Sequence, residues 1–89
     1  MEYNVIKNAS GILNSSKYYV SNPTKYKGKW NDFFGNHNPI YLELGTGRGE
    51  FIIQMAKKYP EYNFIGLELN ESQIATAAKK LERENINNL

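Results

Sequence analysis

Regular apolar patterns begin at residue 39 of this sequence. Residues 40–44 form a short apolar run between Pro39 and Gly45, which predicts a strand buried on both faces. Residues 63–69 form a second run of this kind and predict a second strand. Both runs are shorter than a typical helix and are followed by loop residues.

Each predicted strand is followed by apolar residues at helical spacing. After the first strand they predict a helix that ends before Pro60, with this buried face: Phe51, Ile52, Met55, Ala56 and Tyr59. After the second strand, Asn70 is expected to cap a helix, with Gln73 completing a capping box. That helix is expected to fray near Asn85 and to bury Ile74, Ala77, Ala78 and Leu81.

The element order strand–helix–strand–helix predicts an α/β fold with a parallel sheet and right-handed connections. Residues 1–38 are polar and rich in Asn and Tyr, so we expect an irregular leader with short helical turns, one of them over residues 29–34 and closed by Gly35. Two parallel strands with two helices cannot cover both sheet edges and both strand faces. We therefore expect a partial domain, marginal or self-associating in isolation, whose next strand begins near Leu89.

Composition excludes several classes of protein. The 89 residues allow at most one domain, and the absence of cysteine excludes disulfide scaffolds and thiolate metal sites. His37 is the single histidine, so no metal site is expected. No apolar run approaches the roughly 20 residues that span a bilayer, and no secretory signal is visible. A cytoplasmic protein is the default expectation.

The charge is unevenly distributed along the chain. Residues 1–30 contain five lysines and one glutamate, a net charge of +4, whereas residues 31–89 contain six basic and eight acidic residues, a net charge of −2. The basic leader indicates either a polyanionic partner or a solvated lysine-rich surface. Lys25, Lys27 and Lys29 would share one face of an extended strand and could meet successive phosphates. Trp30 could stack on a base or anchor the leader to the domain.

A glycine-rich turn, Gly45-Thr46-Gly47-Arg48-Gly49, joins the first strand to the first helix. Such a turn lets a ligand approach the backbone, and we expect it to present unpaired amides. The dinucleotide-binding motif G-x-G-x-x-G needs its third glycine at position 50, which is Glu50. A P-loop is excluded too, because the turn has no G-K-[ST] ending. Glu43, two residues before the turn, would repel a pyrophosphate and suits a cationic group. S-adenosylmethionine has an ammonium group and no phosphate.

Glu68 is the second acidic candidate. It lies at the carboxyl end of the second predicted strand, 19 residues after Gly49. An acidic residue there accepts hydrogen bonds from ribose hydroxyls in doubly wound folds, and two hydroxyls could meet two carboxylate oxygens. Glu43, the turn at Gly45 and Gly47, and Glu68 therefore outline one ligand. The alternative is a plain turn beside a surface charge.

Residues 22–89 resemble the bacterial tRNA (guanine-N7)-methyltransferase family of class I methyltransferases. The run Glu43-Leu-Gly-Thr-Gly-Arg-Gly49 is similar to a motif that many methyltransferases share. These more specific segments also carry the resemblance: Asn22-Pro23, Lys27-Gly28-Lys29-Trp30, Phe34-Gly35-Asn36, Pro39-Ile40, Tyr59-Pro60-Glu61 and residues 63–68. Members of this family often begin with an arginine-rich leader, from which this chain departs.

The resemblance implies a partial Rossmann-like class I methyltransferase domain over residues 39–89, after the leader at 1–38. It implies that S-adenosylmethionine is the cofactor, contacted by Glu43, Gly45, Gly47 and Glu68, and that tRNA is the partner, methylated at N7 of a guanine. The family's catalytic, adenine-contacting and tRNA-binding residues would follow Leu89. Two alternatives stay open: a class I methyltransferase with another acceptor, or a non-catalytic nucleotide-binding fragment. The oligomeric state, monomer or homodimer, is open too.

Overall fold

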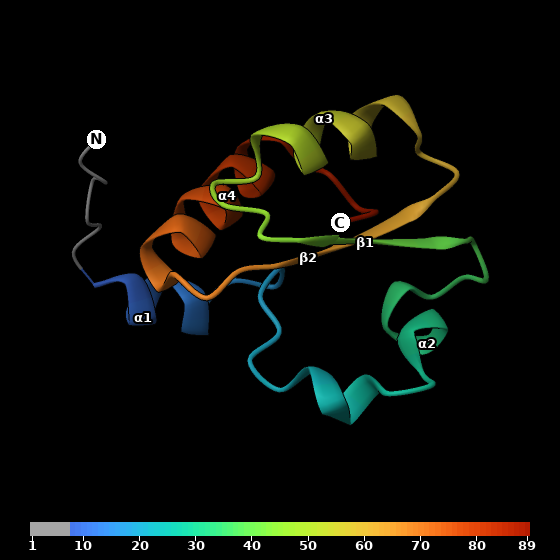
Figure 1. The fold of residues 1–89 in the computed structure, drawn as a ribbon, viewed down its shortest axis with the longest axis horizontal. Helices are drawn as coiled ribbons and strands as arrows, with labels where there is room; N and C mark the ends of the chain where they lie inside the picture. Colours follow the sequence, from blue (N-terminus) through green and yellow to red (C-terminus); the bar gives the residue numbers. More distant parts are fainter. Residues whose placement is uncertain (1–7) are drawn as a thin grey trace.

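The computed structural model describes residues 8–89 and contains the predicted order of strands and helices (Figure 1). The elements are α1 (Ala9–Asn14), the 3₁₀ turn η1 (Pro23–Tyr26), α2 (Trp30–Phe34), β1 (Ile40–Leu44), α3 (Glu50–Lys58), β2 (Asn63–Leu67) and α4 (Glu71–Glu84). Glu2 and Lys7 of the basic leader lie outside the described residues. None of the described helices is long and apolar enough to cross a bilayer.

Strands β1 and β2 form a parallel pair without a register shift. Ile40 pairs with Asn63 and Leu44 pairs with Leu67, so the carboxyl ends of both strands lie side by side. The α/β fold with a parallel sheet, predicted from the sequence, is confirmed. Because the loops after β1 and β2 both leave from these carboxyl ends, the glycine turn and Glu68 are brought together.

The second edge of β2 meets the last residues of the chain. The Asn63 N–H donates to Pro39 O, 2.8 Å away, toward β1, whereas the Phe64 N–H donates to Asn88 O, 2.7 Å away. Successive amides of a strand point to opposite edges, so Asn88 lies along the edge of β2 that faces away from β1. A third strand added there would give the order 3-2-1, as in doubly wound folds.

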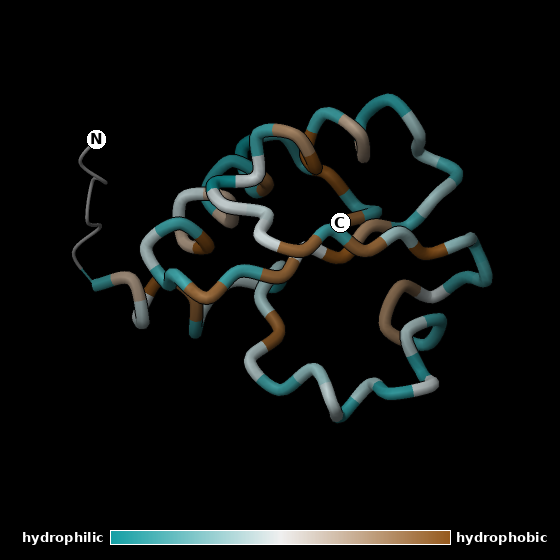
Figure 2. Tube along the Cα trace, viewed as in Figure 1, coloured by the Kyte–Doolittle hydropathy of each residue, from teal (hydrophilic) through white to brown (hydrophobic). Residues whose placement is uncertain are grey.

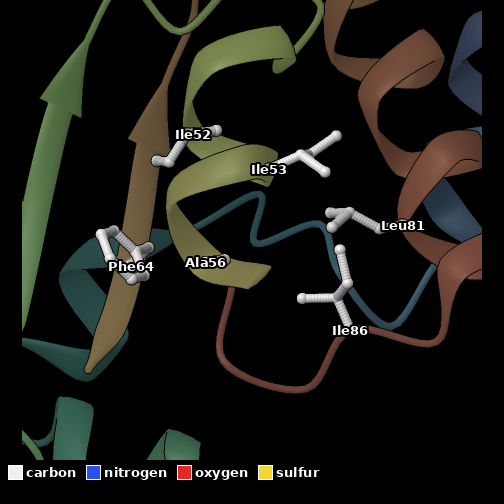
Figure 3. Packing of buried hydrophobic residues seen from close by; sticks show 6 residues of the cluster. All are labelled: Ile52, Ile53, Ala56, Phe64, Leu81 and Ile86. Carbon is white, nitrogen blue, oxygen red and sulfur yellow. The ribbon is translucent and has the colours of Figure 1, made fainter. Parts of the chain in front are cut away.

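The core lies between α3, β2 and α4 (Figure 3). It is made of Ile52, Ile53, Ala56, Phe64, Leu81 and Ile86. The prediction that Phe51 is buried is wrong, because Phe51 is 64% exposed and Ile53 is buried in its place. The reason is that α3 packs against α4 as well as β2, so its buried face turns toward Leu81. Met55 and Tyr59 pack partly buried against this cluster, as predicted.

Helix α4 has a second contact, with α1. Leu13 of α1 packs with Ala75 and Ala78, and Ala75 is fully buried. The predicted Ala78 and Leu81 are buried, whereas Ile74 and Ala77 are only partly buried. The helix pattern missed Ala75 because the pattern assumes one buried face, and α1 covers a second one.

Strand β1 is far more exposed than predicted. Its exposed apolar residues are Ile40 (38%), Tyr41 (51%), Leu42 (58%) and Leu44 (74%). Figure 2 shows hydrophobic stretches, in brown, along the two paired strands. The prediction of burial on both faces is therefore wrong for residues 8–89, because the buried clusters within this range contain no residue of β1. The expectation that two strands leave strand faces uncovered is confirmed for β1 within residues 8–89.

The leader folds as turns rather than as an extended strand. Lys25 lies within η1, and Lys29 precedes the first turn of α2, so the predicted single face of alternating lysines is wrong. Pro23 begins the 3₁₀ turn, and Gly28, with φ 73°, reverses the chain. Gly35 closes α2 with φ 73° and its N–H donates to Asn31 O, as predicted. All three lysines, Lys25, Lys27 and Lys29, are exposed.

Trp30 packs within an aromatic cluster of the leader. Its ring centroid lies 5.3 Å from that of Tyr26 and 5.6 Å from that of Phe33. Phe33 in turn makes an edge contact with Phe34 at 5.2 Å. Trp30 is half-buried by these contacts. Its packing role in the leader is thus visible, and part of its surface stays accessible.

Asn88 is expected to matter for stability because its side-chain amide joins α3 to β2. Its Nδ2 donates toward the carbonyl oxygens of Ala56, Tyr59 and Tyr62, at 2.9, 3.1 and 2.9 Å. Asn88→Asp keeps the shape but puts a carboxylate against three carbonyl oxygens. It should lower the free energy of unfolding by about 1–3 kcal/mol in urea titrations. The neighbouring exposed Asn87→Asp is the control, and equal stability of the two variants would contradict the role of Asn88.

Candidate cofactor site

The glycine turn requires its glycines because of backbone conformation. Gly45, Gly47 and Gly49 have φ of 71°, 57° and 80°. This left-handed region costs a side-chain-bearing residue energy and costs glycine none. Gly49 is the residue before α3, so the alternating glycines fold the chain sharply from the end of β1 into the helix.

The amides of this turn are bonded within the protein. The Gly45 and Thr46 N–H groups both donate to Leu67 O, at 2.8 and 2.9 Å. The Gly47 N–H donates to Glu68 Oε1 at 2.8 Å, and the Gly49 N–H donates to Thr46 O at 3.0 Å. The prediction that the turn presents unpaired amides is wrong at these four positions. The reason is that the turn bends back onto the end of β2, which supplies the acceptors. These four N–H groups are therefore not available to donate hydrogen bonds to a phosphate group.

Glu43 lies in β1 opposite Gly66 and is half-buried. Its Oε1 accepts a hydrogen bond from the Thr46 hydroxyl. A carboxylate has about four acceptor positions, so most of those of Glu43 stay available. A half-buried carboxylate with free acceptor positions suits a cationic group with several N–H donors.

Glu68 directly follows β2 and accepts three backbone hydrogen bonds. Oε1 accepts from the Gly47 N–H at 2.8 Å, and Oε2 accepts from the N–H groups of Leu69 and Asn70, at 3.0 and 3.1 Å. Hydrogen bonds from the amides of Asn70 and then Gly47 lower the pKa of Glu68 below 4.5, because they favour the charged carboxylate. Glu68 therefore ties the glycine turn to the start of α4.

These three bonds limit what Glu68 can offer a ligand. With about four acceptor positions on a carboxylate, one remains free on Oε1. One hydroxyl can bond there directly, and a second one would have to replace a backbone amide.

Asn70 caps α4 as predicted, since its Oδ1 accepts from the Gln73 N–H at 3.1 Å. Its own N–H goes to Glu68, and so the reciprocal half of the predicted capping box gives way to Glu68.

The lowered pKa of Glu68 predicts a pH-dependent contribution to stability. A carboxylate whose pKa is lower in the folded state stabilises the fold above its unfolded pKa, and this stabilisation is lost as the pH falls through the folded pKa. The difference in unfolding free energy between the wild type and Glu68→Gln should be constant above about pH 5.5. It should shrink as the pH falls below 4.5. Thermal melts from pH 7 to pH 3 measure it, and a constant difference would contradict the prediction.

A cavity of about 390 Å³ opens beside this turn. Thr46, Gly66 and Glu68 line it on the side of the strand ends, and Trp30 and Phe33 line it from the leader. Its volume is in the range of small-molecule sites, which are mostly apolar with a few polar groups. The leader thus contributes apolar surface to the cavity that Glu68 lines.

The structure places all four predicted site residues, Glu43, Gly45, Gly47 and Glu68, around one turn. It adds Thr46, whose hydroxyl and amide bond to both strand ends, and Gly66, on which Thr46 rests. The sequence signal for Thr46 was its place between two glycines of the turn, to which no role was assigned. Gly66 carried a signal as the single glycine inside a strand, which indicates a close approach of other atoms.

The fold and the site define a class. A parallel strand–glycine turn–helix–strand unit with carboxylates near both strand ends is a partial Rossmann-like unit, and its backbone N–H groups at Gly45, Thr46, Gly47 and Gly49 are all bonded within the protein. Residues 37–89 match a family model described as "Putative methyltransferase". The chain belongs to this methyltransferase family.

Curated relatives are similar to most of the chain. It is 51% identical over 70 residues to a tRNA (guanine-N(7)-)-methyltransferase of Oceanobacillus iheyensis, and 53% identical over 70 residues to one of Bacillus subtilis. Both matches cover 79% of this chain and 33% of the relative. A third, from Pediococcus pentosaceus, is 55% identical over 64 residues, which is 72% of this chain and 30% of the relative. The chain thus spans about a third of the length of these relatives.

Proposed function

We propose that the site binds S-adenosylmethionine, with Glu43 at its ammonium group, Gly45 and Gly47 beside its middle and Glu68 at a ribose hydroxyl. The observation that carries this proposal is the glycine turn whose amides at Gly45, Thr46, Gly47 and Gly49 are all bonded internally. A turn of this kind, between two carboxylates, disfavours phosphate-bearing cofactors. It fits a ligand with a cationic end, a ribose and no phosphate.

When bound, S-adenosylmethionine supplies an electrophilic methyl group on its sulfonium. The residues of this chain bind and orient it: Glu43 holds the cationic end, and Glu68 fixes the ribose while holding the turn. Such positioning is a large part of catalysis for a transfer between two bound reactants. No described residue is assigned a catalytic role in the transfer itself.

We further propose that the acceptor is N7 of a guanine in tRNA, and that the activity belongs to the cytoplasm. The support is the identity of about 50% to proteins named tRNA (guanine-N(7)-)-methyltransferase. Guanine N7 has a free lone pair at neutral pH, so the reaction needs no general base to begin. The exposed lysines Lys25, Lys27 and Lys29 of the leader supply positive charge that suits an RNA backbone.

The test is methyl transfer by the complete protein to an unmodified tRNA transcript. Nuclease digestion and mass spectrometry should find 7-methylguanosine. A transcript made with 7-deazaguanosine lacks the acceptor nitrogen and should take no methyl group. Methylation of the deaza transcript, or of a protein or small molecule alone, would contradict the acceptor while leaving a class I methyltransferase. Binding of a dinucleotide in preference to S-adenosylmethionine would contradict the cofactor.

A further inference from the structure

Position 66 requires glycine because neighbouring atoms leave no room for a side chain, whereas the glycines of the turn are required by their positive φ. It lies inside β2 and does not have a positive φ, so its backbone conformation suits any residue. A Cβ at position 66 would lie 2.8 Å from both Thr46 Cγ2 and Thr46 Oγ1 and 2.9 Å from Thr46 Cβ. Real Cβ atoms do not approach other atoms this closely, and the third distance involves an atom that no side-chain rotation moves. Thr46 therefore occupies the space that a side chain on Gly66 would fill.

Thr46 in this position bonds to both strand ends. Its N–H donates to Leu67 O of β2 at 2.9 Å, and its hydroxyl donates to Glu43 Oε1 of β1. Because Glu43 pairs with Gly66 in the sheet, the space over Gly66 that Thr46 occupies lies next to the carboxylate that the hydroxyl reaches. One Glu43 oxygen is thereby held, and within residues 8–89 no hydrogen bond engages the other.

We propose that Thr46 is a positioning residue for Glu43 and that Gly66 is required to admit it. The hydroxyl of Thr46 holds the Glu43 carboxylate in one orientation, with its remaining acceptor positions available to the ammonium group of the ligand. This inference rests on the proposed S-adenosylmethionine site. It assigns the selection of the cationic end of the cofactor to three residues, Glu43, Thr46 and Gly66.

The test compares two substitutions of Thr46 in the complete protein. Thr46→Val removes the hydroxyl and keeps the shape, whereas Thr46→Ser keeps the hydroxyl. Each is titrated calorimetrically with two probes. S-adenosylhomocysteine has the ammonium group, and 5′-methylthioadenosine keeps the adenosine and the sulfur but lacks the ammonium group. Thr46→Val should weaken S-adenosylhomocysteine binding about 5- to 10-fold and leave 5′-methylthioadenosine within about 2-fold. Thr46→Ser should leave both within about 2-fold.

The outcomes separate this inference from the proposed function. If the wild type binds neither probe, the proposed function fails. If the wild type binds both and Thr46→Val weakens both equally, Thr46 shapes the turn in general and the inference is overturned. Unchanged binding of both probes by Thr46→Val overturns it as well.

Gly66 is tested by a second pair of variants. Gly66→Ala should weaken S-adenosylhomocysteine binding and lower the thermal midpoint, because Thr46 is displaced. In a Thr46→Gly background the overlapping atoms are gone, so Gly66→Ala should cost little further stability. That background should still bind S-adenosylhomocysteine as weakly as Thr46→Val does. Full affinity in Gly66→Ala, or restored affinity in the double variant, would refute the role of Gly66.

Discussion

Replacing Glu68 by Gln in the complete protein should lower its affinity for S-adenosylmethionine about 10- to 100-fold, because a charge-assisted hydrogen bond is worth about 1.5–3 kcal/mol. The amide also has one oxygen in place of two, so it can no longer accept from both Gly47 on one side and Asn70 on the other. The loss thus combines a ribose contact with a loosened glycine turn. Isothermal titration of wild type and variant measures the affinity.

The matched control for this variant is Glu50→Gln. Glu50 lies in the first turn of α3, is exposed, and contacts Arg48 only at 3.8 Å. The Glu50→Gln substitution removes the same charge near the turn without removing an acceptor of the turn amides. Its affinity should stay within about 2-fold of the wild type. Equal affinity of Glu68→Gln and Glu50→Gln would show that Glu68 does not hold the ribose.

The parts of the fold that local pattern determines could be predicted. The strands, the helices after them and the caps at Gly35 and Asn70 follow from spacing and from single residues. The buried faces were predicted less well, because they depend on neighbours distant in sequence. Ala75 is buried by α1, and Ile53 by the approach of α4. The exposure of β1 depends on which elements pack against its faces, which no residue within the strand specifies.

The candidate site was predicted at the level of residue types, and its bonding was not. The glycine spacing and the two acidic residues located the turn and both carboxylates. The sequence could not show that Leu67 O and Glu68 take the turn amides, because those acceptors belong to the neighbouring strand end. This internal bonding strengthens the argument against a phosphate ligand, which the sequence supported by Glu50 in place of a third glycine and by the acidic Glu43 before the turn. It also leaves Glu68 with one free acceptor position where two were expected.

The lysines of the leader are predicted to contribute to tRNA binding. Lys25, Lys27 and Lys29 lie within five residues on a turn-rich segment, and all are exposed. Lys25 Nζ lies 5.7 Å from the centre of the Tyr26 ring, and no described acidic group pairs with these three lysines. They are therefore available to phosphate groups, although from a folded turn and not from an extended strand.

Changing all three lysines to Gln in the complete protein should weaken tRNA binding and flatten its salt dependence. Each lost phosphate contact lowers the slope of log K against log salt by about 0.7–0.9, so three contacts lower it by about 2–3. Affinity for S-adenosylmethionine should not change, because none of these lysines lines the cavity beside the turn. Filter binding from 50 to 300 mM salt (about a six-fold range) gives the slope.

The control removes the same charge from the helices of the domain. Lys58, Lys79 and Lys80 lie on α3 and α4, and their combined change to Gln lowers the net charge by the same three units. If the leader contacts tRNA, its variant loses slope and the helical variant does not. If both variants lose affinity equally, the effect is one of overall charge. Such a result would return the leader lysines to a solvated surface, with Trp30 and its aromatic neighbours packing within the leader for structural reasons alone.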